Sequence, residues 1–283
     1  MATATGQSPG RRRPALRLRA EAGALPFRRG ALRRAEIEFE TGMVAAGRLP
    51  LVLAELHRCL PVGGRLDVVL PAGKAGDSVP PSVGERLDAV LTGAGFDLSA
   101  VRAQSQAAGI VCRRARTLPD TVAPGMRVLV CGLNPSLYAA DAGTAFARPG
   151  NRFWPAALAA GLVSVDRDPW HALRHHRVGM TDLVKRATVA AGELTSDEYR
   201  RGVARVERLC AELRPAVVCF VGLAGWRAAV DRAAPAGPQP GTLGGRPVYL
   251  MPSTSGRNAS ARLDELTSHL RAALTLAEPA GDG

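Results

Sequence analysis

Apolar runs and helical periodicities alternate along the second half of this chain. The runs at 127–133, 216–221 and 247–251 are almost continuously apolar. Such runs are typical of strands buried on both faces of a parallel sheet that is covered by helices. The remaining pattern predicts a strand or turn around 178–184 and helices beginning near Arg152 and at 196–213, 223–232 and 260–275. Together these elements predict an α/β fold with a central, mainly parallel sheet.

The first half of the chain carries a shorter pattern of the same kind. Between residues 36 and 117 it predicts helices at 43–60 and 83–94, and strands at 65–70 and around 109–115. Residues 118–124 contain two prolines and are interpreted as a short linker. We therefore expect a basic tail at 1–35, a smaller α/β segment at 36–117 and a larger α/β domain at 118–277.

The net charge favours a polyanionic partner, but its position weakens that inference. The whole chain carries +12 with a pI near 10.7, as nucleic-acid-binding proteins often do. Residues 1–34 contain nine Arg and one Glu, so +8 of the +12 lies there and +4 remains for the rest. Only Lys74 and Lys185 are lysines, and this Arg-rich, Ala-rich composition also fits a GC-rich coding bias. We expect residues 1–35 to form a disordered tail.

The cysteines and the apolar segments indicate the cellular compartment in which the protein is expected. Five cysteines are scattered without a Cys-x-x-Cys pair, which disfavours disulfides, zinc and iron–sulfur ligation. No apolar run approaches the roughly 20 residues of a membrane-spanning helix. No apolar segment follows Arg11–Arg13, as it would in a secretory signal. The sequence therefore predicts a cytoplasmic, nucleoid-associated protein with no metal and no membrane partner.

The most informative stretch is 127–154. An apolar run from Val128 to Cys131 ends in a turn that carries Asn134 and is stiffened by Pro135. Ligands of α/β sheets bind at the carboxyl ends of the strands. An Asn side chain is neutral, so it can hold and polarise a water molecule but cannot act as a strong base. This turn is the first candidate for a functional site.

Residues 36–117 resemble the C-terminal half of a class I methyltransferase fold, in the segments LPVGGRLDVVLP, LDAVLTGAGFD and GIVCRRAR. Nothing upstream offers a strand followed by a Gly-rich turn and a downstream acidic residue, which is the arrangement that holds S-adenosylmethionine. We interpret this segment as a vestigial or accessory module and expect no cofactor.

Residues 121–275 resemble the mismatch-specific uracil/thymine-DNA glycosylase family of the uracil-DNA glycosylase superfamily. Four segments carry the resemblance in the family's order and approximate spacing: GLNPS at 132–136, FARPGNRFW at 146–154, GMTDLVKRAT at 179–188 and MPSTSGR at 251–257. The resemblance implies a three-layer α/β/α fold. It also implies an enzyme that flips a mismatched or damaged base out of double-stranded DNA and hydrolyses its N-glycosidic bond (EC 3.2.2.-).

The resemblance also assigns roles to single residues. It makes Asn134 the residue that positions the attacking water and Phe146 the aromatic on which the flipped base stacks, with Gly132 and Leu133 in the base pocket. Asn151 either ties the loop down or touches the base. The loop after the last strand would bind DNA, with Arg257 filling the vacated stack. The residues of that loop are Ser253, Thr254, Ser255, Gly256 and Arg257.

Two departures from the family affect the expected substrate range. Ser136 replaces the final Gly of the first segment, and Asp182 stands where relatives carry Asn or Lys. Asp182 is a second catalytic candidate, which could orient water or pair with Lys185 or Arg186. Because Lys185 shows no sign of a desolvating pocket, we expect a monofunctional enzyme without Schiff-base chemistry.

The expected protein is a monomer, and the preferred lesion stays open between uracil, thymine, ethenocytosine and hypoxanthine. The alternatives are a DNA-binding protein that has lost catalysis and a protein derived from a methyltransferase. The absence of a carboxylate in place of Asn134 predicts a slow enzyme that depends on a good leaving group.

Overall fold

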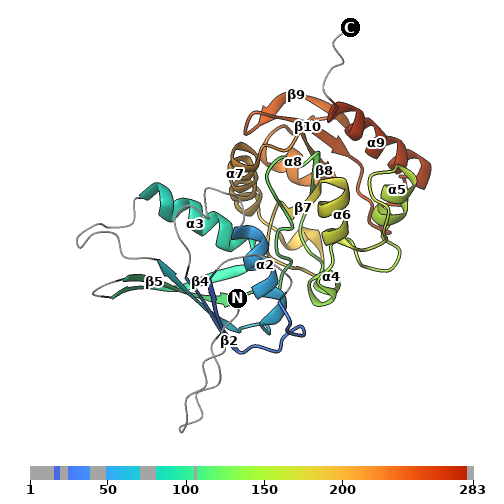
Figure 1. The fold of residues 1–283 in the computed structure, drawn as a ribbon. Helices are drawn as coiled ribbons and strands as arrows, with labels where there is room; N and C mark the ends of the chain where they lie inside the picture. The colour runs from blue at the N-terminus through green and yellow to red at the C-terminus, as the bar shows by residue number, and fades with distance from the viewer. Residues whose placement is uncertain (1–15, 20–24, 39–48, 71–80, 105–106, 279–283) are drawn as a thin grey trace. The chain divides into compact units, whose positions relative to one another are not determined.

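The computed structural model of this chain describes residues 16–19, 25–38, 49–70, 81–104 and 107–278 (Figure 1). It divides into two compact units, Met1–Pro119 and Asp120–Gly283.

The first unit contains one five-stranded sheet with two helices. Its strand order is β1-β2-β3-β5-β4, in which β1, β2 and β3 are parallel and the β4–β5 hairpin is antiparallel. The elements are β1 (Leu16–Arg19), β2 (Arg34–Glu38), α2 (Leu49–Cys59), β3 (Arg65–Leu70), α3 (Pro81–Gly93), β4 (Phe96–Gln104) and β5 (Ala107–Arg114). Apolar side chains of both helices and of the strands form its core.

The expected helices and strands of this unit are found, but the unit begins earlier than residue 36. Strand β1 pairs with β2, and the side chains of Leu32 and Ala35 are buried in the core. Arg58 donates a hydrogen bond to the main-chain oxygen of Phe27 at 2.7 Å. The expected disordered tail is therefore wrong for residues 25–35, because their arginines conceal a short alternating strand pattern. Residues 1–15 and 20–24 of that tail, and 43–48 of the expected first helix, lie outside the described residues.

The second unit contains a five-stranded sheet in the order β7-β6-β8-β10-β9. Strands β7, β6, β8 and β10 are parallel, and β9 is an antiparallel edge strand. The strands are β6 (Val128–Gly132), β7 (Val178–Asp182), β8 (Val217–Val221), β9 (Gly237–Leu243) and β10 (Arg246–Met251). The helices are α4 (Leu137–Ala142), α5 (Phe153–Ala159), α6 (Pro169–His176), α7 (Ser196–Leu213), α8 (Ala224–Ala229) and α9 (Leu263–Leu276).

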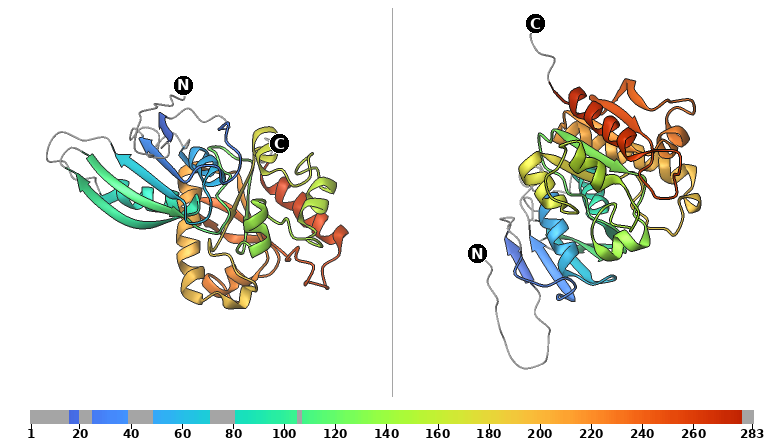
Figure 2. Two further views of the ribbon diagram at one scale, coloured as in Figure 1. Left: turned by 90° about the horizontal axis from the view of Figure 1, so that it is seen from below. Right: turned by 90° about the vertical axis from the view of Figure 1, so that its right-hand side faces the viewer.

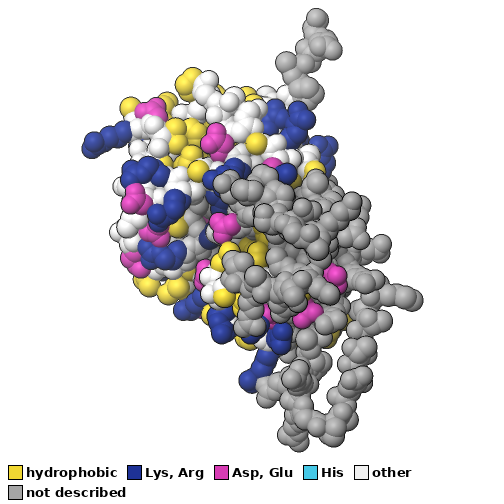
Figure 3. Space-filling view, turned by 90° about the vertical axis from the view of Figure 1, so that its left-hand side faces the viewer, with side chains coloured by type: hydrophobic (Ala, Val, Ile, Leu, Met, Phe, Trp, Pro, Cys, Tyr) yellow, Lys and Arg dark blue, Asp and Glu magenta, His cyan; other side chains and the backbone are white. Residues whose placement is uncertain are grey.

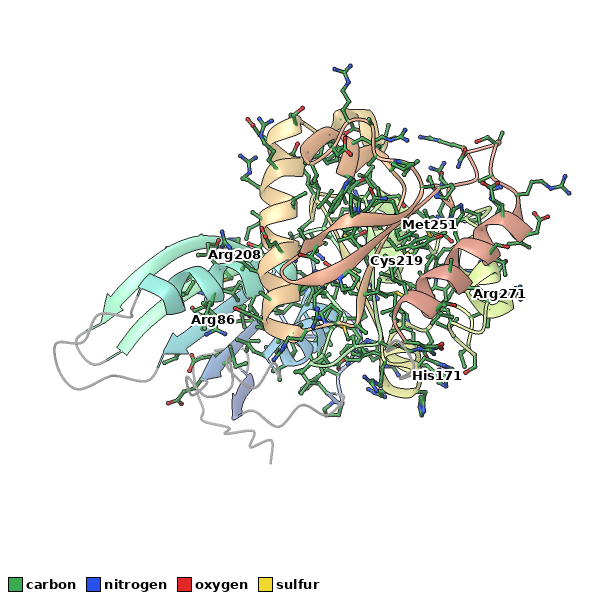
Figure 4. All side chains as sticks on the ribbon, turned by 90° about the horizontal axis from the view of Figure 1, so that it is seen from above. Arg86, His171, Arg208, Cys219, Met251 and Arg271 are labelled. Carbon is green, nitrogen blue, oxygen red and sulfur yellow. The ribbon has the colours of Figure 1, made fainter. Side chains whose placement is uncertain are left out.

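Helices cover both faces of this sheet, which confirms the expected three-layer α/β/α fold (Figures 1 and 2). Alternate residues of a strand point to opposite faces. The strand residues that point to the same face as Val130 and Cys219 pack with α5, α6 and α9 in one buried cluster. Phe220 points to the opposite face, where its ring contacts the Trp226 ring of α8 edge-to-face, with the ring centroids 5.1 Å apart. Figure 4 shows Cys219 and Met251 between the helices, with Arg208 on α7 and Arg271 on α9.

The apolar runs locate β6, β8 and β10 correctly, and helix α7 has the predicted bounds of 196–213. Helices α4 and α6 and strand β9, which have six, eight and seven residues, were not predicted. Residues 120–124 of the expected linker belong to this unit. Thr121 pairs with Met180 across the open edge of β7, and Val122 is fully buried.

The cysteines behave as small core residues. All five are free and buried, and burial raises the pKa of the Cys112, Cys210 and Cys219 thiols to about 12. Within the described ranges, no helix has the length and apolarity that crossing a membrane requires.

Candidate functional site

The carboxyl ends of the parallel strands bring the four quoted segments to one edge of the sheet. Gly132 at the end of β6 and Asp182 at the end of β7 are partners in the strand register. A Cβ on Gly222, just after β8, would lie 3.7 Å from the Cβ of Ser253, just after β10. The sequence segments that are far apart in the chain therefore meet where α/β folds bind ligands.

Gly132 lies between a carboxylate and an aromatic ring. A Cβ at this position would lie 2.5 Å from Oδ1 of Asp182 and 3.4 Å from Cζ of Phe146. The first distance is shorter than van der Waals contact allows, so only glycine fits without a shift of Asp182. The bare backbone at Gly132 thus separates the two side chains that the sequence singled out.

The Asn134 carboxamide is held by its nitrogen. Nδ2 donates to Oγ1 of Thr188 at 2.8 Å and to the main-chain oxygens of Arg186 at 3.0 Å and Pro135 at 3.2 Å. Carbonyl oxygens can only accept, so this set of partners fixes which end of the carboxamide is nitrogen. Oδ1, at the other end of the carboxamide, has acceptor capacity that these bonds do not use.

Phe146 forms an aromatic platform in a strained backbone conformation. Its φ is 56°, in the left-handed region that bulky residues rarely adopt. Its ring stacks on Phe153 with centroids 4.1 Å apart and an interplanar angle of 23°. The indole nitrogen of Trp154 donates to the main-chain oxygen of Ala145 at 2.8 Å, which fixes the residue just before Phe146.

Asp120 is the centre of a buried polar cluster beneath β7. Its carboxylate accepts hydrogen bonds from Oγ1 of Thr181 at 2.6 Å, from Nζ of Lys185 at 2.8 Å and from Arg205 at 2.7 Å. Arg205 also donates to the main-chain oxygen of Asp182 at 2.5 Å. Although burial opposes ionisation of Asp120, the Arg205 and Lys185 charges lower its pKa. The cluster fixes the end of β7.

At Asp182 burial outweighs the neighbouring positive charges, so the pKa of its carboxyl is raised, whereas that of Asp120 is lowered. It is 6% exposed, and burial raises the pKa of its carboxyl to about 6, with the Asp120 charge adding to the rise and Lys185 and Arg205 opposing it. Lys185 binds Asp120, and Arg186 binds Glu198 at 2.7 Å. These two ion pairs replace the pairings that the sequence suggested for Asp182.

Side chains of the loop that follows β10 form hydrogen bonds with the main chain of the same loop. Oγ of Ser253 accepts from the amide of Ser255 and Oγ of Ser255 from the amide of Arg257, both at 3.3 Å. Nδ2 of Asn258 donates to the main-chain oxygen of Ser253 at 2.8 Å. Arg257 and Gly256 are exposed at the tip.

Three of the residues predicted for the site do other work in this structure. Cδ1 of Leu133 would lie 2.7 Å from a Cβ on Gly225, so its side chain packs toward α8 and only its main chain borders the site. Oδ1 of Asn151 accepts from the amide of Phe153 at 2.9 Å, at the first residue of α5. Thr254 is 1% exposed, so its side chain is packed inside rather than facing a phosphate.

Sequence reasoning missed several residues that hold the site together. Thr188 lies inside a quoted segment but received no role, and Asp120 was assigned to the linker. Arg205 lies on α7 among other charged residues, so its burial gave no local signal. Its partners are distant in the chain, and only the fold brings them together.

The charged surface side chains that the structure describes do not mark a further site. On the side drawn in Figure 3, Lys and Arg side chains are interspersed with Asp and Glu. Among the described residues, no group of three or more His, Cys, Asp or Glu side chains is arranged to hold a metal ion.

The comparison with known proteins decides the family. The family model for the uracil DNA glycosylase superfamily matches residues 119–275, more than half of the chain and nearly all of the second unit. The chain belongs to the uracil DNA glycosylase superfamily.

Parts of this chain are similar to solved structures. A solution structure from Methanosarcina acetivorans, described as a candidate uracil DNA glycosylase, is 21% identical with a TM-score of 0.36 and covers 56% of this chain and 97% of its own. A SAM-dependent methyltransferase from Aquifex aeolicus is 17% identical with a TM-score of 0.27 and covers 34% of this chain. This chain spans about half (52%) of that methyltransferase.

Proposed function

We propose that this member of the superfamily is a monofunctional DNA glycosylase of the mismatch-specific uracil/thymine type. Its substrate is a uracil or thymine opposite guanine, or a related lesion, flipped out of double-stranded DNA. The observation that carries the proposal is the approach of Asp182 and Phe146 to the bare backbone of Gly132, two residues before Asn134 in the same turn. We further propose that the enzyme acts as a cytoplasmic monomer.

The flipped base stacks on Phe146, whose ring is supported from behind by Phe153. Stacking of a base on an aromatic side chain contributes roughly 1–3 kcal/mol. The absence of a side chain at Gly132 lets the Asp182 carboxylate and the Phe146 ring approach the same stretch of backbone.

Hydrolysis then requires a positioned water. Oδ1 of Asn134 accepts one hydrogen of the water, whose oxygen attacks C1′ as the bond to the base nitrogen breaks. The bonding electrons leave with the base, and the second water proton passes to Asp182, directly or through another water. A carboxyl with a pKa of about 6 is ionised at neutral pH and can accept that proton.

Lys185 supports the monofunctional part of the proposal. A lysine that forms a Schiff base must be neutral and must reach C1′. Nζ of Lys185 instead donates to the buried Asp120 carboxylate at 2.8 Å, so it is engaged in an ion pair within the protein. We expect abasic DNA as the product, with strand cleavage only after alkali treatment.

Single-turnover excision by the full chain on a panel of lesion duplexes tests the proposal. Wild type should release at least one of uracil, thymine, ethenocytosine and hypoxanthine. Asn134→Ala should lower that rate about 100-fold, which corresponds to roughly 3 kcal/mol of barrier, and should leave lesion-DNA binding close to wild type because no charge changes.

Asn134→Asp is the matched variant. A carboxylate activates water more strongly than a carboxamide, so excision of uracil should persist or rise. If Asn134→Ala keeps the wild-type rate on every lesion cleaved, Asn134 is only a turn residue. Binding of lesion DNA without release of any base would favour the alternative of a catalytically inactive DNA-binding protein.

A further inference from the structure

The segment Asn151–Trp154 touches both sides of the candidate site. Phe153 supports the Phe146 ring, and Trp154 holds the main chain of Ala145 just before it. Arg152 lies between Asn151 and Phe153 and is the residue just before the first residue of α5. Arg152 binds the loop 252–261, which joins β10 to α9.

Arg152 binds that loop through four of its carbonyl oxygens. Its main-chain amide donates to the oxygen of Thr254 at 2.9 Å. Its guanidinium donates to the oxygens of Ser255 at 3.0 Å and Asn258 at 2.5 Å, and to that of Ala261. These acceptors lie on both sides of Arg257, so one side chain spans the base of the loop tip.

The two loops also approach each other closely at a second point. A Cβ on Gly256 would lie 2.9 Å from the main-chain oxygen of Gly150. Any larger residue at position 256 would push the loop away from the segment that leads into Arg152. The loop tip is therefore positioned by a fork of hydrogen bonds and by a backbone contact that only glycine permits.

We propose that Arg152 is a positioning residue that sets the loop 252–258 for insertion of Arg257 and ties it to the Phe146 platform. The inference rests on the proposed function. The guanidinium of Arg152 is suited to binding several loop carbonyls because it is planar, always charged and offers several donors in a fixed geometry. A lysine offers only a point charge on a flexible stem. The four carbonyls belong to an irregular loop and have no sheet ladder to organise them.

A double-mutant cycle tests the inference. Arg152→Lys should lower single-turnover excision from a duplex about tenfold, while excision from single-stranded substrate stays near wild type, because the vacated stack exists only in a duplex. Arg257→Ala should then cost much less in the Arg152→Lys background than in wild type, since coupled residues are not additive. Additive losses would overturn the proposal.

Two further variants serve as controls for this interpretation. Arg148→Lys, an exposed neighbour in the same loop, should leave both rates unchanged. Gly256→Ala, which disturbs the loop contact without touching Arg152, should reproduce the duplex-specific loss and should serve in the cycle if Arg152→Lys fails to fold. An equal loss on single and double strands in both variants would indicate a general structural role.

Hydrogen exchange separates this inference from the proposed function. The amides of Arg257 and Asn258 should exchange faster in Arg152→Lys than in wild type, while those of strand β10 stay unchanged. If wild type releases no base from any duplex, the proposed function fails, and the exchange result still decides whether Arg152 holds the loop. Unchanged exchange in the loop would refute the positioning role.

Discussion

Asp182 should destabilise the protein at neutral pH, and Asp182→Asn should relieve that cost. The carboxyl is 6% exposed, and burial raises its pKa from 3.8 to about 6. The native state therefore holds a proton at pH values where the unfolded chain has already lost it. Stability falls as pH rises between about 4 and 6 and stays lower above that window.

The pKa rise sets the size of the effect. Each pKa unit corresponds to about 1.36 kcal/mol, so a rise from 3.8 to about 6 corresponds to roughly 3 kcal/mol of unfolding free energy at pH 7.5. Asp182→Asn removes the charge with little change in shape. The variant should be more stable than wild type by up to that amount at pH 7.5, and the difference should vanish near pH 4.

Urea unfolding from pH 4 to 8 measures the difference, with Asp166→Asn as an exposed control that should change little at any pH. The same variant should excise slowly, because the amide cannot accept a proton from water. Wild-type excision should rise through about pH 6, and the profile of Asp182→Asn should be flat. A variant less stable than wild type at pH 7.5, or a pH-independent stability difference, would refute the reasoning.

Three further predictions follow from the same contacts. Arg257→Ala should weaken affinity for lesion and product duplexes more than it slows cleavage of single strands, and equal slowing on both would contradict a role in the stack. Asp120→Asn should lower the unfolding free energy by about 3–5 kcal/mol, because Lys185 and Arg205 would lose their buried counter-charge; a thermal melt unchanged from wild type would argue against it. The fragment 118–283, which retains Asp120, should fold and excise at a rate close to the full chain, with weaker affinity at low salt because the basic N-terminal residues are missing. A folded fragment without activity, or calorimetric binding of S-adenosylmethionine by the full chain, would contradict the two-unit interpretation.

The sequence alone predicted the central strands of the second unit, β6, β8 and β10, because they are largely buried. Continuous apolar runs such as 217–221 have one plausible environment, and helix α7 begins at a Thr195 cap with Glu198 three residues later, a local signal that needs no tertiary contact. The four short segments likewise indicated Asn134, Phe146 and Arg257. In the first unit the pattern was weaker, and strands β1, β2 and β4 were not predicted.

Tertiary structure decided which polar residues share an environment. Asp120 and Asp182 are the same residue type within one domain, yet the pKa of one carboxyl is lowered and that of the other is raised. The difference depends on where Lys185 and Arg205 reach, and Arg205 lies 85 positions from Asp120 in the chain. The contacts of Arg152 with the loop after β10 join residues more than 100 positions apart. Periodicity and turn chemistry act over a few residues, so they specify strands, helices and caps, whereas hydrogen bonds and charges across the sheet edge exist only after the chain has folded.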